Sequence, residues 1–428
     1  MNVNSKWTVG FCAVALICLL GCAGQPHHSL AAIERATPAA LNIDAARLEQ
    51  EAEAMRGEIR AGVVPGAVMV VGRNGKLAWE KTLGNQGPDD TTPMSLDTIF
   101  RIQSMTKPVV SVAVMTLVQE GRIGLDDPVS KYLPEYTQST VYDNGAIRPA
   151  KTVMTIRHLL THTSGLIAVV GPPRTPLAEI WAKSGVWTLD RTVLEAARAT
   201  GALPLLADPG TVWNYGRSVD VLGALLEVVT GKTFDVVLKE RIFTPLGMKD
   251  TDFYLSSSQA AGRVAQPPRG GRPFDPTARH PMMYGTNGLA STTRDYLRFT
   301  MMLAGGGALD GVRILKPETL RLMTTNQIGS GIDRSRFHYK DGGGFGLGFG
   351  LKPEGVGSPH ATEVWTWGGS DGTNFWVDPK SGVFTVFMIQ NAAEGPRLQA
   401  RFNTAVFEAT QDTTADHIAM LKRKSPDG

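Results

Sequence analysis

Apolar residues recur at helical spacing near both ends of the chain. Between Asp44 and Arg60 they stand three or four positions apart, and Gly62 follows them. This period predicts a helix with one buried face, which the glycine ends. A second set of apolar residues has the same spacing and predicts a closing helix: Leu398, Phe402, Val406 and Ala409.

Runs of β-branched and aromatic residues lie between these two helices. Residues 66–84 contain two such runs around Asn74-Gly75, a dipeptide that favours tight hairpin turns, so we expect two paired strands there. Four further runs predict strands in the C-terminal part of the chain: 345–351, 363–367, 373–378 and 382–390.

The middle of the chain, from about 110 to 335, has a mainly helical pattern broken by loops rich in proline and glycine. One helix start is marked by Thr292, a capping residue, with Asp295 three positions later. Strands at both ends with helices between them imply an α/β (α+β) fold. We expect one antiparallel sheet, built from both termini and flanked by helices, with an inserted helical region. A functional site would then lie at the seam between the two.

The N-terminus has the pattern of an export signal. Lys6 precedes an apolar run over residues 9–20, which is too short to span a bilayer but typical of a signal peptide. The run ends in Leu-Leu-Gly before Cys22, which resembles the lipobox of bacterial lipoproteins. We therefore expect lipidation of Cys22, with a plain secretory signal as the alternative. All three cysteines lie in this segment, so the rest of the chain has none to form a disulfide.

These patterns divide the chain into four parts. We expect a lipoprotein signal peptide at 1–22, a polar, alanine-rich tether at 23–42, one folded domain at 43–412 and a polar tail at 413–428. Ala23, rather than an aspartate, follows Cys22, which resembles lipoproteins sent on to the outer membrane. The expected location is the bacterial cell envelope, in the outer membrane facing the periplasm, with the lipid anchor as the link to the membrane.

Composition changes this picture little. The 428 residues are 42% hydrophobic and carry a formal charge of +3. A chain of this length forms one large domain or two closely joined ones, and its charge gives no sign of a nucleic-acid partner. The sequence does not indicate an oligomeric state.

The sharpest candidate for chemistry is Ser104-Met105-Thr106-Lys107, an S-x-x-K tetrad at the start of an apolar helix that we expect to run to Gly121. Residues three apart on a helix are neighbours, so the Lys107 amine can reach the Ser104 hydroxyl. The backbone N–H of Ser104 would be among the unpaired donors of the first turn, where it can bind a developing oxyanion. A capping serine beside a solvated lysine is the structural alternative.

A second serine carries a better-known signature. Gly368, Ser370 and Gly372 satisfy G-x-S-x-G, which marks a nucleophile only where a strand turns sharply into a helix. The residues after Ser370 have the pattern of two strands joined by a tight loop, so the required geometry is not expected. A Ser-His-Asp triad on Ser370 would need His417, in the polar tail.

Two other motifs are weak. His158 and His162 stand four apart, as zinc ligands can, but the glutamate of H-E-x-x-H and a third ligand are missing, so we expect structural histidines and no metal. The segment around Lys232 is half of a phosphate-binding loop, with Leu226 in place of the first glycine. A turn between two helices explains it better, and no cofactor is implied.

From about 45 to 410 the chain resembles the serine β-lactamase-related hydrolases, which include class C β-lactamases, low-molecular-weight D,D-peptidases and family VIII carboxylesterases. The resemblance rests on an ordered set of segments: GVVPGAVMVVGRNGKLAWE, TIRHLLTHTSGL, PGTVWNYG, IFTPLGMKDT, NGLASTTRDYLRF and GFGLGFGL. It implies a β-lactamase/transpeptidase-like fold.

The resemblance also implies roles for single residues. Ser104 matches the nucleophile, Lys107 its lysine partner, and Tyr215 the tyrosine of the Y-x-N element, which serves as general base with the lysine. An unperturbed phenol has a pKa near ~10, so a nearby ammonium from Lys107 would be needed to favour the phenolate. Arg217 stands where the family has its asparagine, which weakens the inference to a β-lactamase.

A K-T-G or H-T-G triplet lines the site in this family, and Trp367-Gly368-Gly369 stands in its place. W-G-G resembles the family VIII esterases. The glycines allow the strand to approach a substrate closely, and the backbone N–H of Ser370 would be the second oxyanion donor. Losing the lysine removes a cation for a substrate carboxylate, so the tryptophan favours uncharged esters.

We therefore expect a serine hydrolase that forms an acyl-enzyme, most simply a carboxylesterase acting on small or medium esters. A β-lactamase or D,D-peptidase acting on lactam or peptide amides is the alternative with the same machinery. A non-catalytic, lipid-anchored binding protein is a third reading, disfavoured by the retention of Ser104, Lys107 and Tyr215. The physiological substrate stays open.

Overall fold

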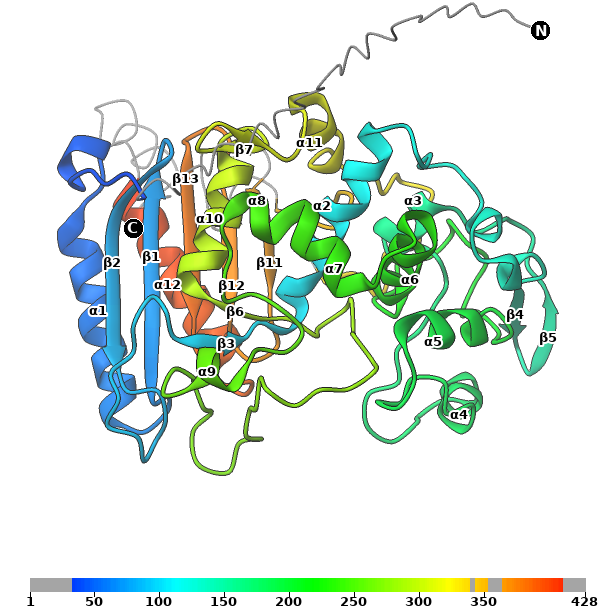
Figure 1. Ribbon diagram of the computed structural model, residues 1–428, viewed down its shortest axis with the longest axis horizontal. Helices are drawn as coiled ribbons and strands as arrows, with labels where there is room; N and C mark the ends of the chain where they lie inside the picture. Colours follow the sequence, from blue (N-terminus) through cyan, green and yellow to red (C-terminus); the bar gives the residue numbers. More distant parts are fainter. Residues whose placement is uncertain (1–32, 339–342, 353–363, 411–428) are drawn as a thin grey trace, which may run out of the picture. The chain divides into compact units, whose positions relative to one another are not determined.

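The expected antiparallel sheet is present, and it joins the two ends of the chain. In the computed structural model, which describes residues 33–338, 343–352 and 364–410, the strand order is β2-β1-β13-β12-β11-β10-β9 (Figure 1). The strands are Lys76–Gly84 (β2), Gly66–Arg73 (β1), Val383–Met388 (β13), Asn374–Val377 (β12), Val364–Gly368 (β11), Gly350–Lys352 (β10) and Gly344–Phe345 (β9). Because β1 pairs with β13, with Val70 opposite Val386, N-terminal and C-terminal strands share one sheet.

Helices cover both faces of this sheet. The predicted terminal helices, α1 (Ala45–Arg60) and α12 (Gly395–Thr410), pack against each other on one face (Figure 1). On the other face α10 (Thr293–Ala304) packs against β13 and β12, and Thr292 caps it as expected by accepting from the N–H of Asp295. This helix packs on the sheet, although it lies within the part of the chain expected to form the helical region.

Strand β1, the second from one edge of the sheet, is buried on both faces. Val68 and Val70 belong to the core on the α10 side, whereas Met69 and Val71 belong to the core beneath α1 and α12. A strand covered on both faces needs apolar residues at successive positions, which explains why this run does not alternate with polar residues.

The region between the sheet strands is mainly helical, as expected. Besides α2 (Thr106–Gln119), its helices are α3 (Ile156–Leu160), α4 (Pro176–Lys183), α5 (Val193–Thr200), α6 (Ser218–Thr230), α7 (Phe234–Leu238), α8 (Thr244–Leu246), α9 (Ser257–Ala260) and α11 (Pro317–Met323). A π-helical turn, η5 (Lys239–Phe243), joins α7 to α8.

Three short strand pairs in this region were not predicted. They are β4 (Thr140–Asp143) with β5 (Ala146–Pro149), β7 (Ala308–Leu309) with β8 (Val312–Arg313), and β3 (Ile99–Arg101) with β6 (Ala290–Thr292). The first two turn at Asn144-Gly145 and Asp310-Gly311, and both asparagine and aspartate adopt positive φ there. These dipeptides favour tight hairpin turns, so the signal for both hairpins was present in the sequence.

One predicted strand is wrong. Residues 345–351 form the ends of two short strands, β9 and β10, with a turn between them. Gly348 adopts a φ of 94°, and a Cβ built on it would lie 2.2 Å from Oγ of Ser111 in α2. The chain bends here because the glycines allow it to pack closely against that helix.

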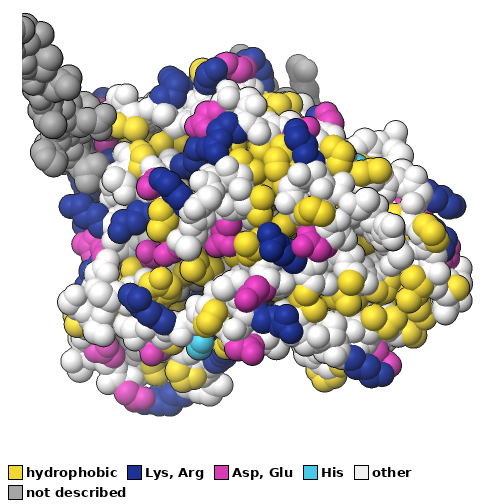
Figure 2. All heavy atoms as spheres, turned by 45° about the vertical axis from the view of Figure 1, so that its right-hand side comes forward, with side chains coloured by type: hydrophobic (Ala, Val, Ile, Leu, Met, Phe, Trp, Pro, Cys, Tyr) yellow, Lys and Arg dark blue, Asp and Glu magenta, His cyan; other side chains and the backbone are white. Residues whose placement is uncertain are grey.

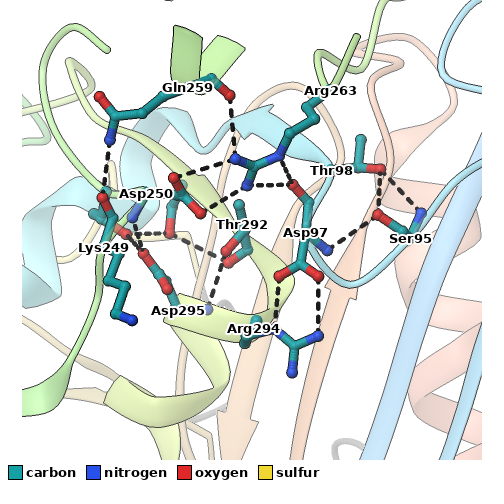
Figure 3. Close-up of polar contacts among 12 residues, drawn as sticks. Ser95, Asp97, Thr98, Lys249, Asp250, Gln259, Arg263, Thr292, Arg294 and Asp295 are labelled. Carbon is teal, nitrogen blue, oxygen red and sulfur yellow. Dashed lines mark hydrogen bonds and ion pairs between the residues drawn. The ribbon is translucent and has the colours of Figure 1, made fainter. Parts of the chain in front are cut away.

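A polar network fixes the segment that leads to Ser104. Arg294, at the start of α10, forms an ion pair with Asp97 just before β3. Arg263 donates to the carbonyl oxygen of Asp97 and to the carboxylate of Asp250, and the backbone N–H of Asp250 donates to buried Asp295 (Figure 3). The residues just before β3, residues 250–263 and the start of α10 are thereby held together.

The surface carries charges of both signs. Figure 2 shows Lys and Arg side chains interspersed with Asp and Glu, with hydrophobic atoms gathered toward the side of the helical region. Val170, in that region, is 90% exposed. Among the helices in the described ranges, none is long and apolar enough to cross a membrane. Cys22, the tether's first residues and the polar tail lie outside those ranges.

Candidate active site

Ser104 lies in a tight turn directly before α2, not in the helix itself. Residues Gln103–Met105 form a 3₁₀ turn (η2), and α2 begins at Thr106 and ends at Gln119, two residues before the predicted end. Gln103 adopts a φ of 48°, which non-glycine residues rarely do. This turn presents Ser104 at the beginning of a buried helix.

Lys107 is one turn further on, and its side chain is 3% exposed. Its Nζ lies 3.1 Å from Oγ of Ser104 and donates to the backbone carbonyl oxygen of Thr286 at 2.6 Å. Burial lowers the pKa of Lys107 to about 7, with Asp220 opposing that change and Arg217 adding to it. A large part of the lysine is therefore a neutral amine at neutral pH.

Tyr215 lies against the same amine. Nζ of Lys107 is 4.3 Å from the centroid of the Tyr215 ring. Burial raises the pKa of the Tyr215 phenol, although Ser104 and Trp367 each act to lower it. The structure thus brings together the three residues predicted to carry the chemistry, with the phenol in its protonated form.

The opposite wall is the end of β11 and the turn that follows it. The N–H of Gly369 donates to the carbonyl oxygen of Thr373 at 2.7 Å, and the turn leads into β12, a strand. A Cβ on Gly369 would lie 2.4 Å from the carbonyl oxygen of Ile102, so this backbone passes directly beside the residues before Ser104. Gly368 ends β11, and Ser370 is exposed in the turn. The strand–turn–helix geometry that a G-x-S-x-G nucleophile requires is therefore not formed at Ser370.

One carboxylate connects the two walls. Asp371 forms an ion pair with Arg101 in β3 and accepts a hydrogen bond from Nε2 of Gln103 at 3.2 Å. Both partners come from the segment that carries Ser104. A partly buried ion pair therefore links the segment that carries Ser104 to the turn that carries Ser370.

Trp367 lies inside an aromatic cluster and is 5% exposed. Its ring centroid is 5.7 Å from that of Tyr215 and 5.4 Å from that of Phe345. His162 and His338 contact Tyr215 as well, with centroid distances of 4.9 and 5.2 Å. Burial and the nearby Lys107 charge lower the pKa of both imidazoles. Sequence reasoning assigned neither histidine to the site, because it interpreted His162 as a structural histidine and no motif marks His338.

Arg217 points toward a carboxylate of its own helix. Its Nη1 lies 3.2 Å from Oδ2 of Asp220, and its guanidinium is 5.0 and 4.9 Å from the ring centroids of Trp187 and Tyr284. The residue that replaces the family's asparagine is therefore engaged within the protein. Asp220 and Thr286, which complete this arrangement, were also missed from the sequence.

The weak motifs have structural explanations. Nδ1 of His158 accepts from the N–H of Thr155 at the start of α3, and His162 packs on Tyr215. Within the described residues, no group of histidine, cysteine, aspartate or glutamate side chains is arranged to hold a metal ion. The segment around Lys232 is the turn between α6 and α7, where Gly231 has a φ of 70°.

Comparison with known proteins identifies the family. The model of the β-lactamase family matches residues 45–409. An uncharacterized protein of Mycobacterium tuberculosis is 35% identical over 366 residues, which cover 78% of this chain and 88% of the relative. Esterase EstB of Burkholderia gladioli is 29% identical over 84% of this chain and 94% of its own.

A solved structure confirms the fold. EstCE1, described as a hydrolase with promiscuous acyltransferase activity, superposes with a TM-score of 0.72 at 26% identity, over 85% of this chain and 99% of its own. The predicted β-lactamase/transpeptidase-like fold is thus confirmed. The chain belongs to the β-lactamase family and is, like the esterase among its relatives, a serine hydrolase.

Proposed function

We propose that the protein is a carboxylesterase that acts on small or medium uncharged esters through an acyl-enzyme on Ser104. The observation that carries this proposal is the buried Lys107 amine, 3.1 Å from the Ser104 hydroxyl with its pKa lowered to about 7. Such an amine can accept a proton at neutral pH, whereas an exposed lysine remains charged.

The reaction then proceeds in two stages. Neutral Lys107 takes the Ser104 proton as Oγ attacks the ester carbonyl, and the backbone N–H groups of Ser104 and Ser370 bind the oxyanion. The protonated phenol of Tyr215 gives its proton to the leaving alcohol. Water then attacks the acyl-enzyme and gives a proton to the Tyr215 phenolate, and Lys107 returns its proton to Oγ of Ser104 as the carboxylic acid leaves. Lys107 is assigned the base in place of Tyr215 because burial raises the pKa of the phenol.

Ester preference is supported by Trp367. An apolar indole stands where a lysine or histidine would hold a substrate carboxylate, and Arg217 is engaged with Asp220. The esterase and the hydrolase with acyltransferase activity among the similar proteins agree with this choice. A β-lactamase or D,D-peptidase would use the same acyl-enzyme and is the outcome to be excluded by experiment.

The test is covalent labelling followed by substrate comparison. Fluorophosphonate-treated protein is digested and analysed by mass spectrometry, and we expect the label on Ser104. Ser104→Ala should not be labelled, whereas Ser370→Ala keeps its backbone N–H and should be. Label on Ser370 would refute the assignment. Faster hydrolysis of a chromogenic cephalosporin than of p-nitrophenyl butyrate would replace the esterase with a β-lactamase.

We also propose that Cys22 is lipidated and anchors the protein in the cell envelope. The support is the apolar run and Leu-Leu-Gly triplet before it. Cells fed radiolabelled palmitate should label the wild-type chain and not Cys22→Ala. Equal labelling of the two would contradict the anchor without affecting the esterase assignment.

A further inference from the structure

Asp220 is a fully buried carboxylate in the first turn of α6. Its Oδ1 accepts hydrogen bonds from the backbone N–H of Thr286 at 2.9 Å and from Oγ1 of Thr286 at 3.0 Å. Oδ2 accepts from the same hydroxyl at 3.1 Å and from Nη1 of Arg217 at 3.2 Å. A buried charge is costly unless it is paired and hydrogen-bonded, and this one has both kinds of partner.

Thr286 links this carboxylate to the reacting lysine. Its N–H and hydroxyl bind Asp220, and its carbonyl oxygen accepts from Nζ of Lys107 at 2.6 Å. The same Nζ reaches Oγ of Ser104 at 3.1 Å. A displacement of Thr286 would therefore move the amine relative to the serine.

We propose that Asp220 is a positioning residue for acylation, which fixes Thr286 so that its carbonyl oxygen holds the Lys107 amine at Ser104. The proposal rests on the function proposed above. Asp220 acts through Thr286, so it is not itself a catalytic residue. The sequence gives it no motif, and its role follows from a contact between residues 66 positions apart.

Arg217 is the counter-charge in this arrangement. The ring faces of Trp187 and Tyr284 hold its guanidinium next to Asp220. The two charges act on Lys107 in opposite directions, since the carboxylate favours the ammonium and the guanidinium disfavours it. The other titratable groups beside Lys107 are Tyr215, His162 and His338.

A purely structural role for Asp220 makes a different prediction. An aspartate in the first turn of a helix stabilises that helix, so its loss would lower stability and leave the plateau of kcat/KM in the folded enzyme unchanged. A positioning role lowers that plateau, whereas the loss of the carboxylate charge moves the pH at which the lysine becomes an active base. The pH profile of kcat/KM, which gives both the plateau and this pH, therefore separates the two explanations.

The experiment measures kcat/KM for p-nitrophenyl butyrate from pH 5.5 to 9 in the full chain. The wild type should lose activity as pH falls through about 7, as Lys107 becomes charged. Asp220→Asn should lower the plateau by about 10²-fold, since a small misplacement of a reacting group has that effect. It should also move the acidic limb of the pH profile, the range over which activity is lost as Lys107 becomes charged, to lower pH by about one unit. The reason is that the negative charge that stabilises the ammonium is lost. Arg217→Gln should move the limb to higher pH.

Thr286→Val is the matched control. It keeps the backbone N–H and carbonyl and the Asp220 charge, so the limb should stay at the wild-type pH and the plateau should fall less than in Asp220→Asn. If Asp220→Asn does not fold, Thr286→Val carries the test, because it removes the hydroxyl that binds Asp220 and leaves both charges in place.

The proposal is overturned if Asp220→Asn keeps the wild-type plateau of kcat/KM, or, where that variant does not fold, if Thr286→Val keeps it. Fluorophosphonate labelling of the wild type separates this failure from failure of the proposed function. Label on Ser104 with an unchanged plateau in the variants removes the role of Asp220 alone. Absence of label on Ser104 removes the proposed function itself.

Discussion

Replacing Lys107 with methionine should abolish esterase activity and stabilise the protein near neutral pH. The lysine is buried, and desolvation is the main reason that its pKa falls from 10.5 to about 7. Each pKa unit corresponds to about 1.4 kcal/mol, so holding the charged lysine in the folded state costs about 5 kcal/mol below pH 7. At pH 7, where about half of the folded molecules have released the proton, the cost is about 4 kcal/mol.

The stabilising interactions that Lys107→Met removes are worth less than this cost. Methionine is unbranched and flexible, and it can fill the space of the lysine stem. It leaves the carbonyl oxygen of Thr286 without the lysine's hydrogen bond, which costs about 1–3 kcal/mol. We therefore expect Lys107→Met to be more stable than the wild type by about 2–4 kcal/mol at pH 6.

The gain should depend on pH in a defined direction. Between about pH 7 and 10.5 the unfolded lysine holds a proton that the folded lysine has released, so wild-type stability rises with pH across this window. Lys107→Met lacks this rise. Its advantage should therefore shrink as pH increases above 7 and disappear by about pH 9–10.

Urea unfolding at pH 6, 8 and 9.5 measures the difference, and hydrolysis of p-nitrophenyl butyrate confirms the loss of activity. A variant that is less stable than the wild type at pH 6 would refute the reasoning, and so would a stability difference that is constant with pH. Either result would mean that Lys107 is not a desolvated amine in the folded protein.

Three other substitutions test the remaining parts of the site. Gly369→Ala should lower kcat by about 10²–10³-fold, because the added Cβ would lie 2.4 Å from the carbonyl oxygen of Ile102 and would displace the proposed oxyanion donor. Steady-state kinetics measure this effect, and an unchanged kcat would contradict it. Asp371→Asn should lower the free energy of unfolding by about 3 kcal/mol, because Arg101 loses its buried partner. Urea titration measures this free energy, and an unchanged value would mean that the ion pair is solvated. Tyr215→Phe should lower kcat by about 10²–10⁴-fold, yet its pH–rate profile should keep the acidic limb near pH 7 if Lys107 is the general base. Loss of that limb from the profile would assign the role of general base to the phenol.

Much of the fold could be predicted because its signals are local. The hairpin at Asn74-Gly75, the terminal helices and the S-x-x-K tetrad each depend on residues close together in sequence. The same holds for the prediction that the G-x-S-x-G motif at Ser370 lacks the strand–turn–helix geometry of a nucleophile. The strand pattern after Ser370 already indicated it. The two missed hairpins carried equally local signals at Asn144-Gly145 and Asp310-Gly311.

The rest of the site depends on tertiary contacts that no local pattern encodes. Asp220 meets Thr286 only because α6 packs beside the loop before β6, and His338 meets Tyr215 across the same region. The proton states are also set by burial, which the sequence does not show. The sequence led us to expect that a charged Lys107 would favour a Tyr215 phenolate, but the Lys107 side chain is partly a neutral amine in the folded protein.

The order of the strands has a consequence for biosynthesis. β1, formed by residues 66–73, needs β13, formed by residues 383–388, as its neighbour. The turn at Ser370, which we propose as an oxyanion donor, likewise comes more than 260 positions after Ser104. Pairings between such distant segments form slowly and require both partners to be present. A nascent or truncated chain ending before β13 would thus contain the proposed nucleophile but not its sheet, so the growing chain should remain inactive until synthesis is almost complete.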